Sequence, residues 1–242
     1  MIIDLTVLFD NYPAEEGFET GWGYSCFVKK GYGGILFDTG ADGEKLLRNI
    51  HKAEIRPDRI LKVVISHFHR DHSGGLKEIV AINNKAKIYV GASQYEEIKK
   101  SLPSARIHKV ASEPLEIMNG VYLTGELGDR IKEISLIMDT GGGLVIITGC
   151  AHPGIKEIIE KAHKIVNDKI FAVVGGLHLK DKKEKEIADL IEFLKNEGVK
   201  YIAPSHCTGD TARELFKQAF GKGFIEAGVG SHIYIGGSCD YV

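Results

Sequence analysis

The sequence has only four cysteines, no long apolar segment and no excess of either charge. Because no apolar run approaches the roughly 18 residues of a membrane-spanning helix, no membrane association is expected. The N-terminus lacks the basic and apolar regions of a secretory signal, so none is expected. The cysteines form no CxxC pair, which favours a reduced, cytoplasmic compartment. They are Cys26, Cys150, Cys207 and Cys239.

Lysine and arginine number 31 against 33 acidic residues, for a net charge of -2. This near balance argues against broad nucleic-acid binding, which needs a basic excess. A length of 242 residues suits one large domain or two tightly fused halves, and we take residues 1–242 as a single domain. The oligomeric state is left open.

Apolar strands alternate with amphipathic helices along the chain, which predicts an α/β protein. Residues 106–139 are expected to form short strands in hairpins, and the spacings at 93–96, 181–184 and 211–214 are those of helix-starting capping boxes. Further strands are expected at about 2–9, 24–29, 34–37, 61–65, 87–90, 144–148, 170–174, 199–203, 224–227 and 231–236.

Three histidines and one aspartate are concentrated in a single turn after the apolar run 61–65. Two imidazoles separated by one residue can reach one ion, and the remaining two side chains can serve a second. Imidazoles with a carboxylate suit zinc, iron or manganese. The alternative is a charged surface loop, but such a loop rarely gathers these residue types. The four residues are His67, His69, Asp71 and His72.

Other candidate ligands also follow the carboxyl ends of apolar strands. Cys150 and His152 follow the strand 144–148, His178 follows 170–174, and His206 follows 199–203. Since α/β proteins place ligands at such strand ends, these residues are expected to share one site with the histidine turn. The histidines away from strand ends are interpreted as structural or surface residues, namely His51, His108, His163 and His232.

The histidine turn, followed by Gly74-Gly75, resembles the signature of the metallo-β-lactamase superfamily. Asp38-Thr39-Gly40 resembles its first motif, and the segments 149–152 and 205–206 fall where its later metal motifs are expected. The resemblance covers nearly the whole chain. It implies a four-layer αββα sandwich with a metal site at one edge, used for hydrolysis by metal-activated water.

Three motifs narrow the resemblance to one branch of the superfamily. They are Gly149-Cys150-Ala151-His152-Pro153-Gly154, Gly175-Gly176-Leu177-His178-Leu179 and His206-Cys207-Thr208-Gly209. This branch is similar to a synthase of methanopterin biosynthesis, which joins a dihydropterin pyrophosphate to a ribofuranosyl-aminobenzene phosphate. The motifs do not select the substrate.

Two departures from the superfamily pattern concern the metals. Most members have a metal-bridging aspartate where this chain has Cys150, whose thiolate can also bridge; otherwise it is a small buried residue. The usual separate histidine is missing between His108 and Cys150. His152 is expected to replace it as a ligand, with substrate orientation or proton donation as alternatives. We expect two zinc ions, with iron or manganese as alternatives.

The resemblance assigns roles to the other candidates. His206 is expected to bind metal, with a structural role as the alternative. Asp71 is a ligand and a candidate general base. His178 is a catalytic candidate. It is expected to contact a metal ion or the substrate phosphate, or to act as a general acid, and the sequence leaves these alternatives open. Asp38 is expected to orient a ligand histidine.

Three residues are candidates for substrate binding. Thr208 precedes a helix whose first N–H groups can meet an anion, Lys180 adds positive charge, and Trp22 can cover a planar ring. The predicted function is therefore a metal-dependent hydrolase that acts on a small anionic or phosphorylated metabolite. The alternatives are a pterin-type synthase that releases pyrophosphate, a phosphodiesterase or nuclease, and a metal-binding sensor without turnover.

Overall fold

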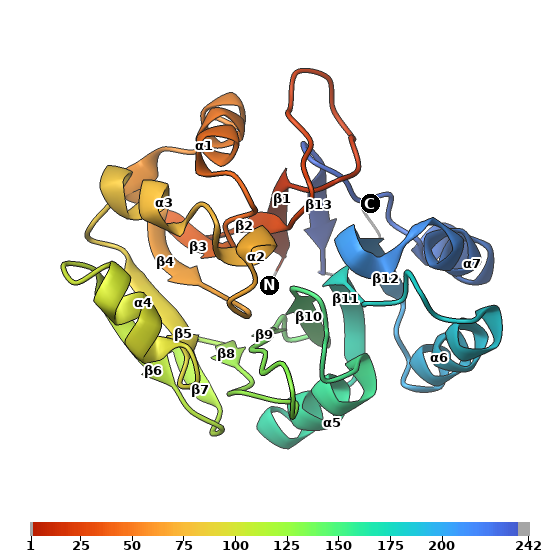
Figure 1. The fold of residues 1–242 in the computed structure, drawn as a ribbon. Helices are drawn as coiled ribbons and strands as arrows, with labels where there is room; N and C mark the ends of the chain where they lie inside the picture. The colour runs from red at the N-terminus through yellow and green to blue at the C-terminus, as the bar shows by residue number, and fades with distance from the viewer. Residues whose placement is uncertain (1, 237–242) are drawn as a thin grey trace.

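The structure, a computed structural model, describes residues 2–236 and contains two mixed β-sheets that lie face to face (Figure 1). The first sheet has the strand order β13-β1-β2-β3-β4-β5-β6. Its strands are β13 (His232–Ile235), β1 (Ile3–Phe9), β2 (Ser25–Lys30), β3 (Gly33–Phe37), β4 (Ile60–Val64), β5 (Lys87–Gly91) and β6 (Arg106–Val110). The four strands from β3 to β6 run parallel, and the others pair antiparallel.

The second sheet has the order β12-β11-β10-β9-β8-β7, with β10, β11 and β12 parallel. Its strands are β7 (Leu115–Met118), β8 (Val121–Leu123), β9 (Leu136–Asp139), β10 (Leu144–Thr148), β11 (Ile170–Gly176) and β12 (Tyr201–Ser205). The helices are α1 (Gly43–Lys52), α2 (Arg70–Ser73), α3 (Leu76–Ile82), α4 (Tyr95–Ser101), α5 (Ile155–Ile165), α6 (Glu184–Asn196) and α7 (Asp210–Phe220), with short 3-10 turns at Pro57–Arg59, His206–Thr208 and Gly221–Gly223.

Three apolar layers hold these elements together. The strand β10 illustrates the pattern, because Val145 and Ile147 pack between the sheets while Leu144 and Ile146 pack against helices of the second sheet. The helices α5, α6 and α7 cover the second sheet, and α1, α3 and α4 cover the first (Figure 1). The strand period of two therefore builds an αββα sandwich, which confirms the predicted fold.

Several predicted element boundaries were wrong. The helix α4 begins after Gln94 without a side-chain cap, because the Ser93 hydroxyl bonds to Glu126 instead. The helix α6 begins after Lys183, where Glu186 closes the capping box, and α7 begins after Gly209. The segment 224–227 forms only an isolated bridge, and β6 pairs in parallel with β5 rather than in a hairpin.

The parallel strands of both sheets direct their carboxyl ends to a common edge, where α2 lies between the two sheets (Figure 1). The strands β3 and β4 lead into Asp38 and the histidine turn, and β10, β11 and β12 lead into Cys150, His178 and His206. None of the helices within residues 2–236 is long and apolar enough to cross a membrane. Cys26, Cys150 and Cys207 are free thiols, while Cys239 lies outside the described residues.

Candidate metal centre

A hydrogen-bond network anchored on the buried Asp38 orients two histidines of the turn. One carboxylate oxygen accepts from the Ser66 backbone N–H at 2.7 Å, and the other accepts from the Ser66 hydroxyl at 2.7 Å and lies 2.6 Å from His72 Nδ1. The Ser66 oxygen in turn lies 2.9 Å from His67 Nδ1. The network contacts the Nδ1 atom of each ring, so the Nε2 atoms of His67 and His72 point away from Asp38 and Ser66.

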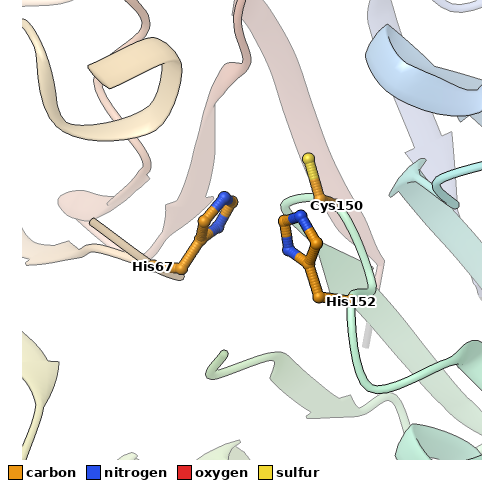
Figure 2. A group of neighbouring side chains, drawn as sticks. All are labelled: His67, Cys150 and His152. Atoms are coloured by element: carbon orange, nitrogen blue, oxygen red, sulfur yellow. The ribbon is translucent and has the colours of Figure 1, made fainter. Parts of the chain in front are cut away.

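The first ligand group consists of His67, His69, Cys150 and His152. His67 Nε2 lies 3.1 Å from His69 Nδ1, and donor atoms of His67, Cys150 and His152 lie within 4.8 Å of one another. Figure 2 shows the imidazoles of His67 and His152 approaching each other from opposite sides, with the Cys150 sulfur beside them. Thus β4 supplies one side of this group and β10 supplies the other.

The second ligand group consists of Asp71, His72, Cys150 and His206. His72 Nε2 lies 3.2 Å from His206 Nε2 and 3.2 Å from Cys150 Sγ. An Asp71 carboxylate oxygen lies 3.3 Å from His206 Nε2. Cys150 belongs to both groups, so its sulfur occupies a position from which one thiolate can contact two cations.

The side chain of Glu133 contacts both the backbone N–H and the ring of His152. This carboxylate is fully buried; one oxygen accepts from the backbone N–H groups of residues 149–151, and the other from His152 N–H. The second oxygen also lies 2.9 Å from His152 Nδ1. Glu133 therefore fixes both the loop after β10 and the orientation of the His152 ring.

The ring protonation that this network imposes fits a bound cation. His72 Nδ1 faces a carboxylate, and His206 Nδ1 faces Asn11 Oδ1 at 3.0 Å while Asn11 Nδ2 donates to His206 O. Both Nδ1 atoms donate, so the neutral His72 ring presents an Nε2 lone pair, whereas His206 Nε2 also faces the Asp71 carboxylate. When the His206 ring is also neutral, two Nε2 lone pairs face each other at 3.2 Å beside a buried thiol, an arrangement that a cation among them stabilises.

The protonation states of the group also suit metal binding. Burial lowers the pKa of His67 to about 2 and that of His72 to about 3, with neighbouring imidazoles adding to the effect. Burial would raise the pKa of Asp71, but the hydrogen bond with His206 and the charge of His72 hold it below its usual range. His67 and His72 are therefore neutral and Asp71 is ionised at neutral pH, as metal ligands must be. Burial lowers the pKa of His206, but the hydrogen bond with Asp71 and nearby negative groups raise it overall, so a cation bound there must displace a proton.

Four strand-end residues of the site adopt a strained backbone. Asp38, Ala151, His178 and His206 have φ between 48 and 57°, in the left-handed region that L-residues seldom occupy. Each such residue costs on the order of 1–3 kcal/mol, which the surrounding hydrogen bonds must offset. Strain at this one edge is typical of a functional site rather than of a structural loop.

His178 and Cys207 adjoin the first ligand group without belonging to it. The His178 ring lies 4.6 Å from the His152 ring and is exposed, and the His178 backbone N–H donates to Cys207 Sγ. Donor atoms of Cys150, His178 and Cys207 lie within 4.8 Å of one another. The thiols interact, which raises the pKa of Cys150 and lowers that of Cys207 to about 4, so a cation bound at Cys150 must displace a proton.

The predicted substrate-binding residues differ in how they reach the centre. The Trp22 ring is 48% exposed and lies 5.0 Å from the His206 ring, and the Lys180 ammonium lies 4.9 Å from the Trp22 ring centroid. The Thr208 side chain is fully buried and its hydroxyl accepts from Leu177 N–H, while the anion-binding role of the backbone N–H groups that follow it stays a prediction. The Thr208 side chain is therefore committed to structure.

Glu133, Asn11 and Cys207 were not singled out from the sequence as site residues. Asn11 lies 195 positions from His206, and Glu133 precedes a strand of the second sheet, so no local motif marks either one. Of the histidines expected outside the site, His108 stacks on Tyr89 and His163 pairs with Glu197, while His232 contacts Thr6 and His51 is exposed.

Comparisons with known proteins agree with this geometry. The sequence matches the Metallo-beta-lactamase superfamily over residues 23–206, which includes both ligand groups. The chain belongs to this superfamily. Its fold is therefore that of a superfamily of metal-dependent enzymes.

Three relatives define the likeness further. The chain is 31% identical to the 7,8-dihydropterin-6-methyl-4-(beta-D-ribofuranosyl)-aminobenzene-5'-phosphate synthase of Methanocaldococcus jannaschii, over 78% of this chain and 80% of the synthase. A solved metal-dependent hydrolase of the beta-lactamase superfamily is 28% identical, with a TM-score of 0.79 over 98% of this chain and 100% of that one. The metallo-beta-lactamase fold protein YhfI of Bacillus subtilis is 15% identical, with a TM-score of 0.69 over 97% of this chain and 100% of YhfI. At this identity the likeness shows the fold alone.

Proposed function

We propose that the protein is a hydrolase that holds two zinc ions and acts on a small anionic or phosphorylated metabolite. The observation that carries the proposal is the arrangement of imidazole nitrogens around the shared sulfur of Cys150. His67, His69, His152 and Cys150 would hold one ion, and Asp71, His72, His206 and Cys150 the other. Bound zinc supplies Lewis acidity, which polarises a phosphoryl or carbonyl oxygen and acidifies water.

The residues around the ligands perform the remaining tasks. His178 is exposed and its pKa is raised by its hydrogen bond with Cys207, although burial opposes this, so its ring can carry a proton to a leaving group. Lys180 and Trp22 form a cationic and aromatic wall beside His206, which suits an anionic substrate that carries a flat group. Asp71 is a ligand in this scheme and, once ionised, also a base for a nearby proton.

A synthase is the second candidate, and the 31% identity to the pterin-pathway synthase favours it. The two activities differ in what the second substrate is. In a hydrolase water attacks the polarised centre, whereas in a synthase another organic molecule replaces water. Release of pyrophosphate from a dihydropterin pyrophosphate that requires an added ribofuranosyl-aminobenzene phosphate would favour the synthase; release without it would favour the hydrolase.

Metal analysis tests the shared premise of both candidates. Protein purified without added metal is expected to hold about two transition-metal equivalents per chain, and fewer than about half an equivalent would contradict the proposal. Cys150→Ser is expected to lower the stoichiometry or affinity, because a hydroxyl is a weaker ligand than a thiolate. Cys26→Ser is the matched control, since Cys26 is equally buried but belongs to neither ligand group.

Activity measurements then distinguish a hydrolase from a sensor module. The zinc-loaded protein is expected to cleave at least one member of a panel of phosphate monoesters, phosphodiesters, lactones and thioesters. His69→Ala is expected to lower that activity by roughly 100-fold or more while the protein stays folded. Full metal loading with no turnover of any panel member or pterin substrate would instead favour a binding module.

A further inference from the structure

A cavity of about 670 Å³ lies beside the first ligand group, between the N-terminal halves of α5 and α6. His152 and His178 line it, so the cavity adjoins the metal centre. Its volume falls within the roughly 300–1,000 Å³ of small-molecule sites. The connection after β11 contributes residues from a third direction, and Figure 1 shows α5 and α6 as neighbours on the outer side of the second sheet.

The lining of this cavity combines aliphatic side chains with exposed charged groups of both signs. Four nearly buried aliphatic side chains contribute to it, namely Ile155, Leu177, Leu179 and Leu190. Among these groups the Lys182 ammonium pairs with Glu186 at 3.2 Å, and the Lys156 ammonium lies over the Phe193 ring. Because three glutamates and two lysines line the cavity, its charged lining carries no positive excess that would favour a second anion.

We propose that this cavity, called the α5–α6 groove, binds an uncharged apolar part of the substrate while the anionic group lies at the metal centre. The inference rests on the proposed function, which supplies the anionic end. The substrate is then a two-part molecule, with an acidic or phosphorylated head joined to an alkyl or aryl body. His178 lies where the two parts join, since its ring adjoins His152 and also lines the groove.

Binding of non-hydrolysable phosphonates to the zinc-loaded protein tests this inference by calorimetry. Methyl-, butyl- and octylphosphonate share one anionic head and differ only in apolar length. Butylphosphonate is expected to bind about tenfold or more tightly than methylphosphonate, and octylphosphonate more tightly still, because each buried methylene is transferred from water. In Leu190→Asn the gain from methyl to butyl is expected to fall below about threefold.

Control variants keep the result interpretable. Leu115→Asn, at a 38% exposed position on β7 at the opposite end of the second sheet, is expected to keep the wild-type dependence on chain length. If Leu190→Asn fails to fold, Leu179→Asn removes apolar surface from the same groove on a loop instead of a helix. Thermal unfolding of each variant confirms that it is folded.

The outcomes separate this inference from the proposed function. Equal affinity for all three phosphonates would overturn the groove and leave the anion-binding metal centre intact. A chain-length dependence that survives in both leucine variants would also overturn it, because the apolar body would then bind elsewhere. Binding of none of the three would contradict the proposed metal-centred anion site and the groove together.

Discussion

At the residue scale, two buried carboxylates organise the centre. A buried charge is costly unless hydrogen bonds compensate for its lost hydration. Glu133 accepts from four backbone N–H groups and from the His152 ring, and these bonds hold its pKa below its usual range although burial opposes this. Asp38 similarly contacts His72 and, through Ser66, His67, but burial raises the pKa of its carboxyl group although the hydrogen bonds from Ser66 oppose this. Each carboxylate thus sets which ring nitrogen faces the cation.

Glu133→Gln is expected to weaken zinc binding by about 10- to 100-fold, because His152 loses the acceptor that orients its ring. The amide group that replaces one oxygen would also face the donors of His152, which should lower the free energy of unfolding by about 2–4 kcal/mol. Competition with a chromophoric chelator measures the affinity, and thermal denaturation measures the stability. Glu113→Gln, at an exposed position, should change neither.

Asn11→Ala provides a comparison for the same prediction, because Asn11 orients a ligand of the second group only. It is expected to weaken the second zinc equivalent and leave the first intact. Wild-type zinc affinity in Glu133→Gln would show that His152 needs no orienting acceptor. Equal weakening of both equivalents in each variant would show that the two groups are not held separately.

At the element scale, the junction of β10 with its following loop allows the two sheets to approach at the centre. Gly149 lies at this junction, and a β-carbon there would contact the Ser66 hydroxyl and lie 2.8 Å from an Asp38 carboxylate oxygen. Only a residue without a side chain lets the loop that carries Cys150 lie against the Asp38 network. The close approach explains why Cys150 can reach ligands of both groups.

Gly149→Ala is therefore expected to lower the free energy of unfolding by about 1–3 kcal/mol through overpacking. It should also reduce zinc content, because the added methyl group separates Ser66 from Asp38. Gly142→Ala is the control, since the nearest atom to its added carbon is Thr140 Oγ1 at 3.8 Å. A normal zinc content in a destabilised Gly149→Ala would disconnect this junction from the ligand geometry.

At the scale of the whole molecule, each ligand group joins the two halves of the sandwich. His67, His69, Asp71 and His72 follow β4 of the first sheet, whereas Cys150, His152 and His206 follow strands of the second. A cation bound by either group therefore connects loops from both sheets. Because only the folded state brings these ligands together, a bound metal ion is expected to stabilise the folded protein in addition to its role in catalysis.

Removal of metal by a chelator is expected to lower the melting temperature by about 5–10 °C. This follows from about 2.7 kcal/mol of stabilisation at a free metal concentration 100-fold above its Kd, and about 2–4 °C per kcal/mol for a chain of this size. Calorimetry before and after dialysis against a chelator measures the shift, and added zinc should restore it. An unchanged melting temperature after verified metal loss would mean that the ligand loops are equally stable without the cation.

Sequence patterns predicted most of the sheet strands and the strand-end placement of the candidate ligands, because both depend on short-range periodicity. They failed where the answer depends on distant partners. Ser93 looked like a helix cap, but its hydroxyl bonds to Glu126 instead. Residues 106–110 were expected in a hairpin, but they pair in parallel with β5 instead. In each case a tertiary hydrogen bond outweighed the local preference.

The sequence by itself determined the layered α/β architecture and the gathering of histidines at strand ends, since apolar period and motif spacing are local properties of the chain. Only the tertiary structure decided which nitrogen of each imidazole faces the centre. That choice depends on Asp38, Asn11 and Glu133, which are far in sequence from most of the rings they hold. It likewise decided that Cys150 adjoins both ligand groups, because a shared position requires two sheets to meet.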